Sequence, residues 1–151
     1  MKEKTLSVSA IKDGTVIDHI AAGQGLKIVR ILNLGEVRIT IGLNLKSASV
    51  GLKDLVKIEG VFLTPQDAAH ITLFSPSATV NVIENYKVVK KFTTPLPESV
   101  SGILYCSHSQ CITHFETVPS LFAVEKSNGL ILLRCRYCEK TFHRDEVKET
   151  V

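Results

Sequence analysis

Four cysteines in the last third of the chain constrain its fold more than any other feature. They form two close pairs, Cys106 with Cys111 and Cys135 with Cys138, in the pattern C-x4-C, 23 residues, C-x2-C. Two such pairs on hairpin-like turns can converge on one tetrahedral ion, and thiolates suit zinc, with bonds of about 2.3 Å. The spacing therefore predicts one structural zinc ion per chain, held by the four cysteines.

Other roles for these cysteines stay open, but they account less well for the spacing of all four. Two disulfide bonds would need an oxidising compartment, and the N-terminal sequence lacks the apolar stretch of a secretion signal. A redox-active C-x2-C pair would leave Cys106 and Cys111 unexplained. Iron uses the same ligands as zinc, and the sequence does not separate the two metals. His108, His114 and His143 could substitute as ligands, although four cysteines already fill four positions.

The segment that carries the cysteines is short and β-rich. Strands are predicted at Ile103–Tyr105, Leu121–Lys126, Leu130–Arg134 and Thr141–His143, with a turn at Ser127-Asn128-Gly129. The 53 residues from 99 to 151 rarely suffice for a hydrophobic core alone. A four-cysteine site is closed to activated water and substrate, so we expect a structural metal that cross-links the domain. We expect a small zinc-ribbon-like domain.

Two prolines mark a boundary between this domain and the rest of the chain. Pro95 and Pro97 stand two apart, which neither a helix interior nor a central strand tolerates. The charge changes there too: residues 1–94 hold 12 basic and 8 acidic residues, and residues 95–151 hold 6 and 7. We expect one domain over 1–94, a linker over 95–98 and a second domain over 99–151. The mild basic excess of the first domain suits a local anion site.

The first 94 residues mix the periodicities of strands and helices. Strands are predicted at Leu6–Ala10, Thr15–Ile20, Val37–Leu45, Leu52–Glu59, Ala78–Ile83 and Tyr86–Phe92, and helices at Gln24–Leu34 and from Thr64 to Ser75. Thr64-Pro65 is typical of a helix start, with an N-cap threonine and proline at the first helical position. The order β, α, β, β, α, β, β predicts an α+β domain, a ferredoxin-like sandwich of two helices over an antiparallel sheet.

Composition and motifs exclude several classes of protein. Apolar residues are 44% and charged residues 22%, as in globular proteins, and no apolar run exceeds four residues, whereas a membrane-spanning helix needs about 20. We therefore expect a cytoplasmic protein with no membrane partner. Gly23-Gln24-Gly25 lacks the third glycine of a dinucleotide-binding motif. Asp18 and His19, as neighbours on a strand, would point to opposite faces and make a poor catalytic pair. The chain shows no enzyme signature.

Two sets of segments carry a close resemblance to a known family. The first set comprises Val8–Ile20, Arg38–Leu45 and Lys53–Glu59, and the second is the cysteine framework with Cys135–Lys140. Together, over nearly the whole chain, they resemble the regulatory chain of aspartate carbamoyltransferase. The resemblance implies a non-catalytic subunit that controls carbamoyl-aspartate formation in pyrimidine biosynthesis. It implies nucleoside triphosphate effectors on the first domain, a zinc domain that docks on the catalytic chain, and self-association as regulatory dimers.

The resemblance also implies roles for single residues. Asp18 matches a residue that contacts the ribose, His19 one near the phosphates, and Lys57 and Lys91 the nucleotide-binding lysines, with Lys53 as a neighbour. The remaining matches form the base-reading strand and the pocket wall: Val8, Ser9, Ala10, Ile11, Asn81, Ile83, Tyr86 and Val88. The four cysteines match the zinc ligands. For Lys53 and Lys57, a solvated strand edge is the ordinary structural alternative.

A zinc-ribbon protein that binds nucleic acid is the alternative function. Its cysteine-bearing part would need positive charge, yet residues 95–151 hold more acidic than basic groups. Four thiolates around one divalent ion add further negative charge. We therefore expect no nucleic-acid partner. A stand-alone enzyme is a second rival, and it lacks both an open metal site and an activated nucleophile.

Overall fold

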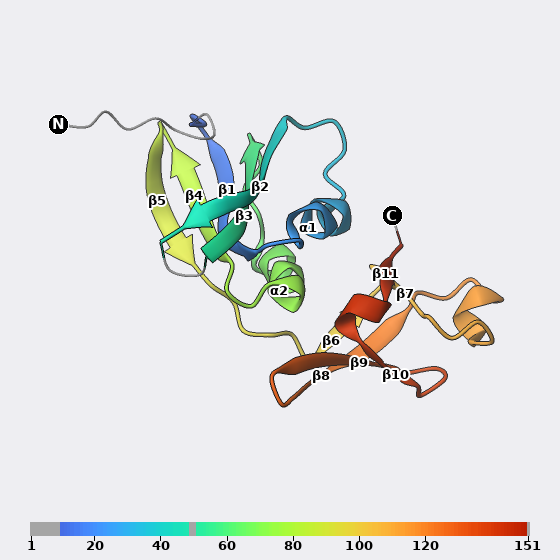
Figure 1. Cartoon of the computed structure of the whole chain (residues 1–151). Coiled ribbons are helices and arrows are strands. Elements are labelled where there is room, and N and C mark those ends of the chain that lie inside the picture. The colour runs from blue at the N-terminus through green and yellow to red at the C-terminus, as the bar shows by residue number, and fades with distance from the viewer. Residues whose placement is uncertain (1–9, 49–50, 151) are drawn as a thin grey trace. The chain divides into compact units, whose positions relative to one another are not determined.

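The computed structural model describes residues 10–48 and 51–150 of the chain (Figure 1). The chain divides into two compact units, residues 1–94 and residues 95–151. Each unit has its own sheet and its own buried side chains. The two units are therefore described separately.

The first unit alternates strands and helices in the predicted order. Its elements are β1 (Gly14–Ala21), α1 (Gly25–Leu32), β2 (Ile39–Ser47), β3 (Gly51–Glu59), α2 (Pro65–Phe74), β4 (Thr79–Glu84) and β5 (Lys87–Phe92). The predicted strand at Leu6–Ala10 lies almost entirely outside the described residues. The α+β fold class predicted from the sequence is confirmed.

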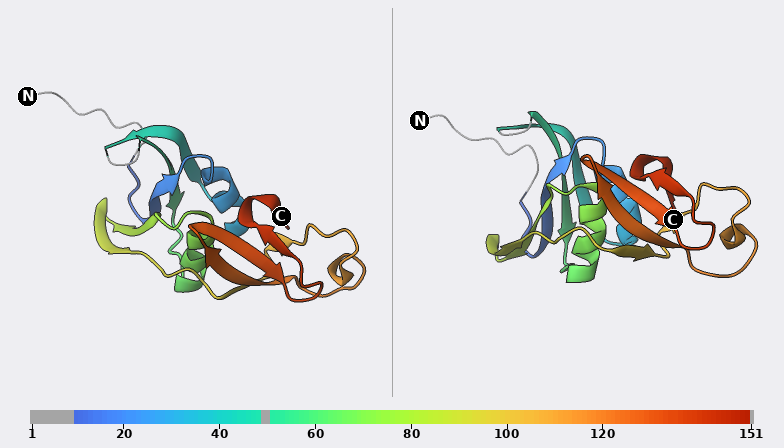
Figure 2. Two further views of the ribbon diagram at one scale, coloured as in Figure 1. Left: turned by 60° about the horizontal axis from the view of Figure 1, so that its bottom comes forward. Right: turned by 90° about the horizontal axis from the view of Figure 1, so that it is seen from below.

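The five strands form one antiparallel sheet in the order β2-β3-β1-β4-β5. The first four strands have the ferredoxin-like order, and β5 extends the sheet beside β4. Both helices lie on one face of the sheet (Figures 1 and 2). On β3 the burial alternates: Asp54, Val56 and Ile58 are fully buried, whereas Lys53 and Lys57 are half-buried. One face of the sheet thus packs against the helices, and the other face stays open for a site.

The two helices begin in different ways. Helix α2 has the predicted start, because the Thr64 side chain accepts a hydrogen bond from the Asp67 N–H and Asp67 accepts one from the Thr64 N–H. Helix α1 has no side-chain cap from its own N-cap residue, Gln24. Its first turn is held instead by Asp54 of β3, which accepts hydrogen bonds from the backbone N–H groups of Gly23 and Gly25 at 3.0 and 2.9 Å.

The second unit is β-rich, as predicted. Its elements are β6 (Ser99–Ser101), β7 (Leu104–Tyr105), the 3-10 turn η1 (Ile112–His114), β8 (Leu121–Ser127), β9 (Leu130–Cys135), β10 (Thr141–His143), the 3-10 turn η2 (Arg144–Glu146) and β11 (Lys148–Glu149). One sheet has the order β10-β9-β8-β6, and a second pairs β11 with β7. Asn128 and Gly129 both have positive φ, as the predicted turn between β8 and β9 requires. Strands β6 and β11 were not predicted; they span three and two residues.

The two α-helices of the first unit are short. Helices α1 and α2 span 8 and 10 residues, and in the part of the chain that the structure describes no helix has the length and apolar character needed to cross a membrane.

Candidate functional site

The four cysteines of the second unit converge on one point. Their sulfur atoms all lie within 4.8 Å of one another. The Cys106 and Cys138 sulfurs are 3.8 Å apart, and those of Cys111 and Cys135 are 3.7 Å apart. A tetrahedral ion with bonds of about 2.3 Å places its ligand sulfurs about 3.8 Å from one another, whereas a disulfide needs about 2.05 Å. The arrangement fits four thiolates around one metal ion and does not fit two disulfides.

Short local elements bring the ligands together. Cys106 directly follows β7, Cys111 precedes η1, Cys135 ends β9, and Cys138 lies in the turn before β10. Burial raises the pKa values of the Cys106 and Cys135 thiols. Burial would also raise the pKa of Cys111, but hydrogen bonds from Thr113 outweigh it and lower the pKa to about 7. Buried thiolates this close repel one another, so the cluster requires a cation.

The nearby histidines stay outside the ligand group, as expected. Nε2 of His114 lies 2.8 Å from the backbone oxygen of Cys106, which ties η1 to the first cysteine. The His114 ring also packs on Tyr105, with ring centroids 4.7 Å apart. His143 has a local role instead, because its Nδ1 accepts a hydrogen bond from the Asp145 N–H at the start of η2.

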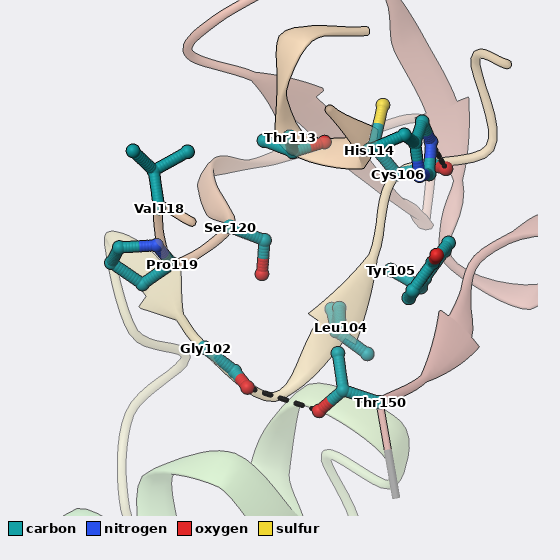
Figure 3. A pocket seen from close by; sticks show the side chains of 10 residues that line it. All are labelled: Gly102, Leu104, Tyr105, Cys106, Thr113, His114, Val118, Pro119, Ser120 and Thr150. Atoms are coloured by element: carbon teal, nitrogen blue, oxygen red, sulfur yellow. Dashed lines mark hydrogen bonds between the residues drawn. The ribbon is translucent and has the colours of Figure 1, made fainter. Parts of the chain in front are cut away.

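A hollow of about 240 Å³ lies beside the cysteine cluster (Figure 3). Its lining is mostly apolar and carries no acidic, lysine or arginine side chain; it comprises Gly102, Leu104, Tyr105, Cys106, Thr113, His114, Val118, Pro119, Ser120 and Thr150. The Ser120 hydroxyl is buried and has no hydrogen-bond partner among the described residues. No pattern in the sequence marked this hollow, because its walls come from four separate segments.

The open face of the first unit carries a second hollow, of about 310 Å³. It is lined by Ala10, Ile11, Val16, Asp18, Leu55, Lys57, Asn81, Ile83, Tyr86 and Val88. Eight of these ten residues were named from the sequence. The other two, Val16 and Leu55, stand two positions before Asp18 and Lys57 on the same strands. The two-residue period of a strand would have identified both.

The remaining site residues named from the sequence lie near this hollow or outside the described residues. Lys53 is next to it, with its Nζ 2.8 Å from Oδ1 of Asp18. Lys91 pairs with Asn81 in the register of β4 and β5. His19 does not line the hollow, and its Nδ1 lies 3.2 Å from the Thr79 hydroxyl. Val8 and Ser9 fall outside the described residues.

Bulges in the strands decide which residues share the open face. On β5, Ile83 pairs with Val88 and Asn81 pairs with Lys91, so Val89 is an extra residue. Because each side chain lies on the face of its partner, Val88 and Lys91 share the face of Ile83 and Asn81 although they stand three apart. A regular strand would have directed Lys91 away from the hollow.

A second bulge lies at Asp18 and His19. Ile17 pairs with Val56 and Ile20 pairs with Asp54, so these two residues stand opposite Leu55 alone, and His19 has a φ of 58°. The strict alternation assumed for Asp18 and His19 is therefore wrong at this point. The two residues are instead linked directly, because the His19 N–H donates to Oδ1 of Asp18 at 2.7 Å.

The charges of the second hollow are coupled. Burial by itself raises the pKa of Asp18, but hydrogen bonds from the Lys53 ammonium and the His19 N–H outweigh it and hold the pKa below its ordinary value. Burial lowers the pKa of Lys57, and the charge of Asp18 offsets only part of that shift. The hollow thus combines apolar walls, one ionised carboxylate and nearby ammonium groups. Such a site can accept a ligand with an apolar ring, hydroxyl groups and an anionic end.

Comparison with known families accounts for both units. A family model described as the aspartate carbamoyltransferase regulatory chain, allosteric domain, matches residues 6–95, and a model for the metal binding domain of the same chain matches residues 98–148. The chain belongs to the aspartate carbamoyltransferase regulatory chain family. The unit with the charged hollow is its allosteric domain, and the unit with the four cysteines is its metal-binding domain.

Curated regulatory chains are similar to this one over nearly their whole length. That of Aeromonas hydrophila is 50% identical over 152 residues, covering 99% of each chain. That of Chromobacterium violaceum is 51% identical over 147 residues, covering 96% of this chain and 97% of its own. That of Vibrio cholerae is 49% identical over 150 residues, covering 98% and 97%. The chain is thus a non-catalytic regulatory subunit rather than an enzyme.

The family confirms the metal prediction and disfavours the rival functions. The four cysteines are positioned to bind one ion in a domain of metal-binding type, for which zinc is the metal. When bound, zinc supplies a cross-link between the two cysteine pairs. The relatives are regulatory chains of a pyrimidine-pathway enzyme, so the zinc-ribbon nucleic-acid binder is not favoured.

Asp54 is the residue of the allosteric domain that sequence reasoning missed. It is fully buried, and besides holding the start of α1 it accepts a hydrogen bond from the Asn44 N–H of β2 at 2.9 Å. It stands next to Lys53, whose ammonium pairs with Asp18 on the opposite face of the sheet. No local signal marks it, because its three donors come from segments that are distant in the sequence.

Proposed function

We propose that the hollow on the open face of the allosteric domain binds nucleoside triphosphate effectors, and that its occupancy regulates the aspartate carbamoyltransferase catalytic chain. The observation that carries this proposal is the gathering of eight residues, named beforehand, around one hollow. They come from β1, β3, β4, β5 and the segments beside them, which are far apart in the sequence. The hollow lies in the domain that the family describes as allosteric.

The chemistry of the hollow matches the three parts of a nucleotide. Lys57 and Lys91 would bind the phosphates, with Lys53 and His19 near them, because ammonium groups are suitable partners for a polyanion. The Asp18 carboxylate would accept hydrogen bonds from the ribose hydroxyls. The base would lie against the mostly apolar wall formed by Ala10, Ile11, Ile83, Tyr86 and Val88, with the polar Asn81 beside it. Val8 and Ser9 belong to the same proposed site.

We propose that the metal-binding domain docks on the catalytic chain. Large apolar side chains are exposed near the cysteine cluster, namely Tyr105, Ile112, Phe115, Val118 and Tyr137. Phe115 is 68% exposed, which is unusual for an aromatic side chain without a partner. A covering protein surface accounts for this exposure, and the metal would keep the loops that carry these side chains rigid.

We also propose that the allosteric domain associates with a second copy of itself. Its sheet has two edges, β2 and β5. Strand β5 carries Lys87, Lys90 and Lys91, and lysines at an edge oppose strand pairing. Strand β2 has few charges, and the exposed Leu26, Leu43 and Leu52 stand on α1, β2 and β3. The β2 edge is therefore the better candidate for the regulatory dimer.

We also propose that the protein is located in the cytoplasm. Four reduced thiolates are required for the metal, and reducing compartments keep them available. The proposed regulation of an enzyme of pyrimidine biosynthesis also favours the cytoplasm.

Calorimetry on the whole chain tests nucleotide binding. A hydrogen bond to a charged group contributes about 1.5–3 kcal/mol, so Lys57→Ala should weaken ATP or CTP binding about 10- to 100-fold. Lys126→Ala, an exposed lysine at the end of β8 in the other domain, is the matched control and should leave affinity unchanged. Equal affinities for wild type and Lys57→Ala would refute the site.

Regulation is tested on the complex reconstituted with the catalytic chain. If effectors shift that chain between two states, a bisubstrate analogue on it must change nucleotide affinity by about 5- to 150-fold, because the coupling is reciprocal. Identical nucleotide dissociation constants with and without the analogue would show binding without regulation.

A further inference from the structure

His19 has a backbone conformation that a histidine rarely adopts. Its φ of 58° lies in the left-handed region, where the Cβ atom crowds the backbone and only glycine is free of strain. The residue stands at the bulge of β1, directly after the proposed ribose-binding residue Asp18. A conformation of this kind persists only when the surrounding contacts hold it.

Three hydrogen bonds hold His19 in place. Its N–H donates to Oδ1 of Asp18 at 2.7 Å, and its carbonyl oxygen accepts from the Ser77 hydroxyl at 2.8 Å. Its ring Nδ1 lies 3.2 Å from the Thr79 hydroxyl. Both of the hydroxyl groups come from the segment between α2 and the start of β4, so this segment clamps the bulge from outside the strand.

The segment that follows α2 also holds β1 beyond the bulge. The Ala21 N–H donates to the buried Ser75 hydroxyl at 2.9 Å, and the Ser75 and Ser77 hydroxyls lie 3.3 Å apart. Serines 75 and 77 therefore hold the end of β1 at two points.

The direction of the Asp18 carboxylate depends on this bulge. Oδ1 of Asp18 accepts from the His19 N–H, and the same atom lies 2.8 Å from Nζ of Lys53. If His19 left the left-handed region, its N–H would turn away and the carboxylate would lose one of these two anchors. The hydroxyl that holds the His19 carbonyl thus acts on the orientation of Asp18 without touching the hollow.

We infer that Ser77 is a positioning residue of the effector site, which locks the bulge at His19 and thereby presents the Asp18 carboxylate to the ribose hydroxyls of the effector. This inference rests on the proposed nucleotide site. Thr79 holds the same bulge through the His19 ring and has the same function. The role concerns the sugar first, because the phosphate-binding Lys57 and Lys91 stand on β3 and β5. Of the groups proposed near the phosphates, His19 is the one that lies at the bulge.

The test compares three probes on the whole chain: ATP, 2′,3′-dideoxy-ATP and inorganic tripolyphosphate. Ser77 is exposed, so Ser77→Ala removes no buried packing. Because one hydrogen bond corresponds to about fivefold in affinity, Ser77→Ala should weaken ATP binding about fivefold. Because Lys57 and Lys91 stay in place, binding of dideoxy-ATP and of tripolyphosphate should weaken less than binding of ATP. Ser101→Ala, the same change at an exposed serine of β6 in the other domain, should alter none of the three.

A second variant separates positioning from general damage. Thr79→Val keeps the shape of a buried side chain and removes its hydroxyl, and it should likewise reduce the preference for ATP over dideoxy-ATP. In an Asp18→Ala background, which lacks the acceptor, Ser77→Ala should have no further effect on that preference, because both changes act on the same contact.

Each remaining outcome overturns the inference. If Ser77→Ala binds all three probes as the wild type does, Ser77 does not position Asp18. If it weakens tripolyphosphate as much as ATP, the hydroxyl only supports the fold. If the wild-type chain binds neither ATP nor tripolyphosphate, the proposed nucleotide site fails, and the role of Ser77 fails with it.

Discussion

The two domains of this chain reach a stable core by different means. Among the described residues, the allosteric domain buries 15 apolar side chains, from Ile11 to Ile83. The metal-binding domain buries nine, and three of those are the cysteines Cys106, Cys111 and Cys135. The first domain thus depends on burial of apolar surface, and the second replaces a large part of that burial with metal ligands.

The difference shows how a short β-rich domain can be ordered without a large core. A structural zinc ion contributes on the order of 10–16 kcal/mol to the folding of a small module. Stability of the second domain should therefore depend on the metal, while that of the first should not.

The largest effect should follow from loss of one metal ligand. In Cys138→Ala the ion loses a quarter of its ligands, so the metal-binding domain should unfold while the allosteric domain keeps its structure. Two-dimensional NMR resolves the two domains, and elemental analysis should fall from one metal ion per chain. Ser127→Ala, at the exposed last residue of β8, is the control and should change neither. If the second domain stays folded without metal, the two domains do not differ in how they are stabilised.

A smaller effect should follow from loss of the buried carboxylate in the allosteric domain. Asp54→Ala leaves the N–H groups of Gly23, Gly25 and Asn44 without their acceptor. An unsatisfied buried donor costs about 1–3 kcal/mol, so the free energy of unfolding should drop by about 3–5 kcal/mol. Urea denaturation followed by signals of each domain measures this, and the metal-binding domain should stay unaffected.

Asp67→Ala is the matched control for Asp54→Ala, because Asp67 also holds the start of a helix. Its contacts with Thr64 are local and exposed, and loss of such a cap costs about 1 kcal/mol. If the two variants lose the same free energy of unfolding, Asp54 stabilises the domain no more than a local helix cap does.

The smallest effect should appear in the pH dependence of effector affinity. Burial lowers the pKa of Lys57 from its ordinary value, so this lysine loses its charge at a lower pH than an exposed lysine as the pH rises. Nucleotide affinity should therefore begin to fall at a pH below the ordinary lysine pKa. Lys57→Arg keeps its charge throughout this range and should remove that part of the fall. Calorimetry as a function of pH measures both; identical profiles would show that Lys57 does not contact the phosphates.

Much of the fold followed from local patterns in the sequence. The Thr64-Pro65 start of α2, the strand alternation on β3 and the turn at Asn128-Gly129 each depend on neighbouring residues, so the sequence alone predicts them. The metal centre was predictable for a related reason: two close pairs of cysteines need only one long-range approach to form a tetrahedral site.

The charged hollow was predictable only in part. The residues around it were named from family resemblance, whereas the bulges at His19 and Val89 depend on which strands pair and in what register. The pairing of Asp18 with Lys53, the cap that Asp54 provides to α1 and the clamp of Ser77 on His19 all join segments that are distant in the chain. The sequence by itself determined the elements, the metal ligands and the candidate residues. Only the tertiary structure decided how those residues face one another, because a strand's register is set by its neighbours in space and not by its own residues.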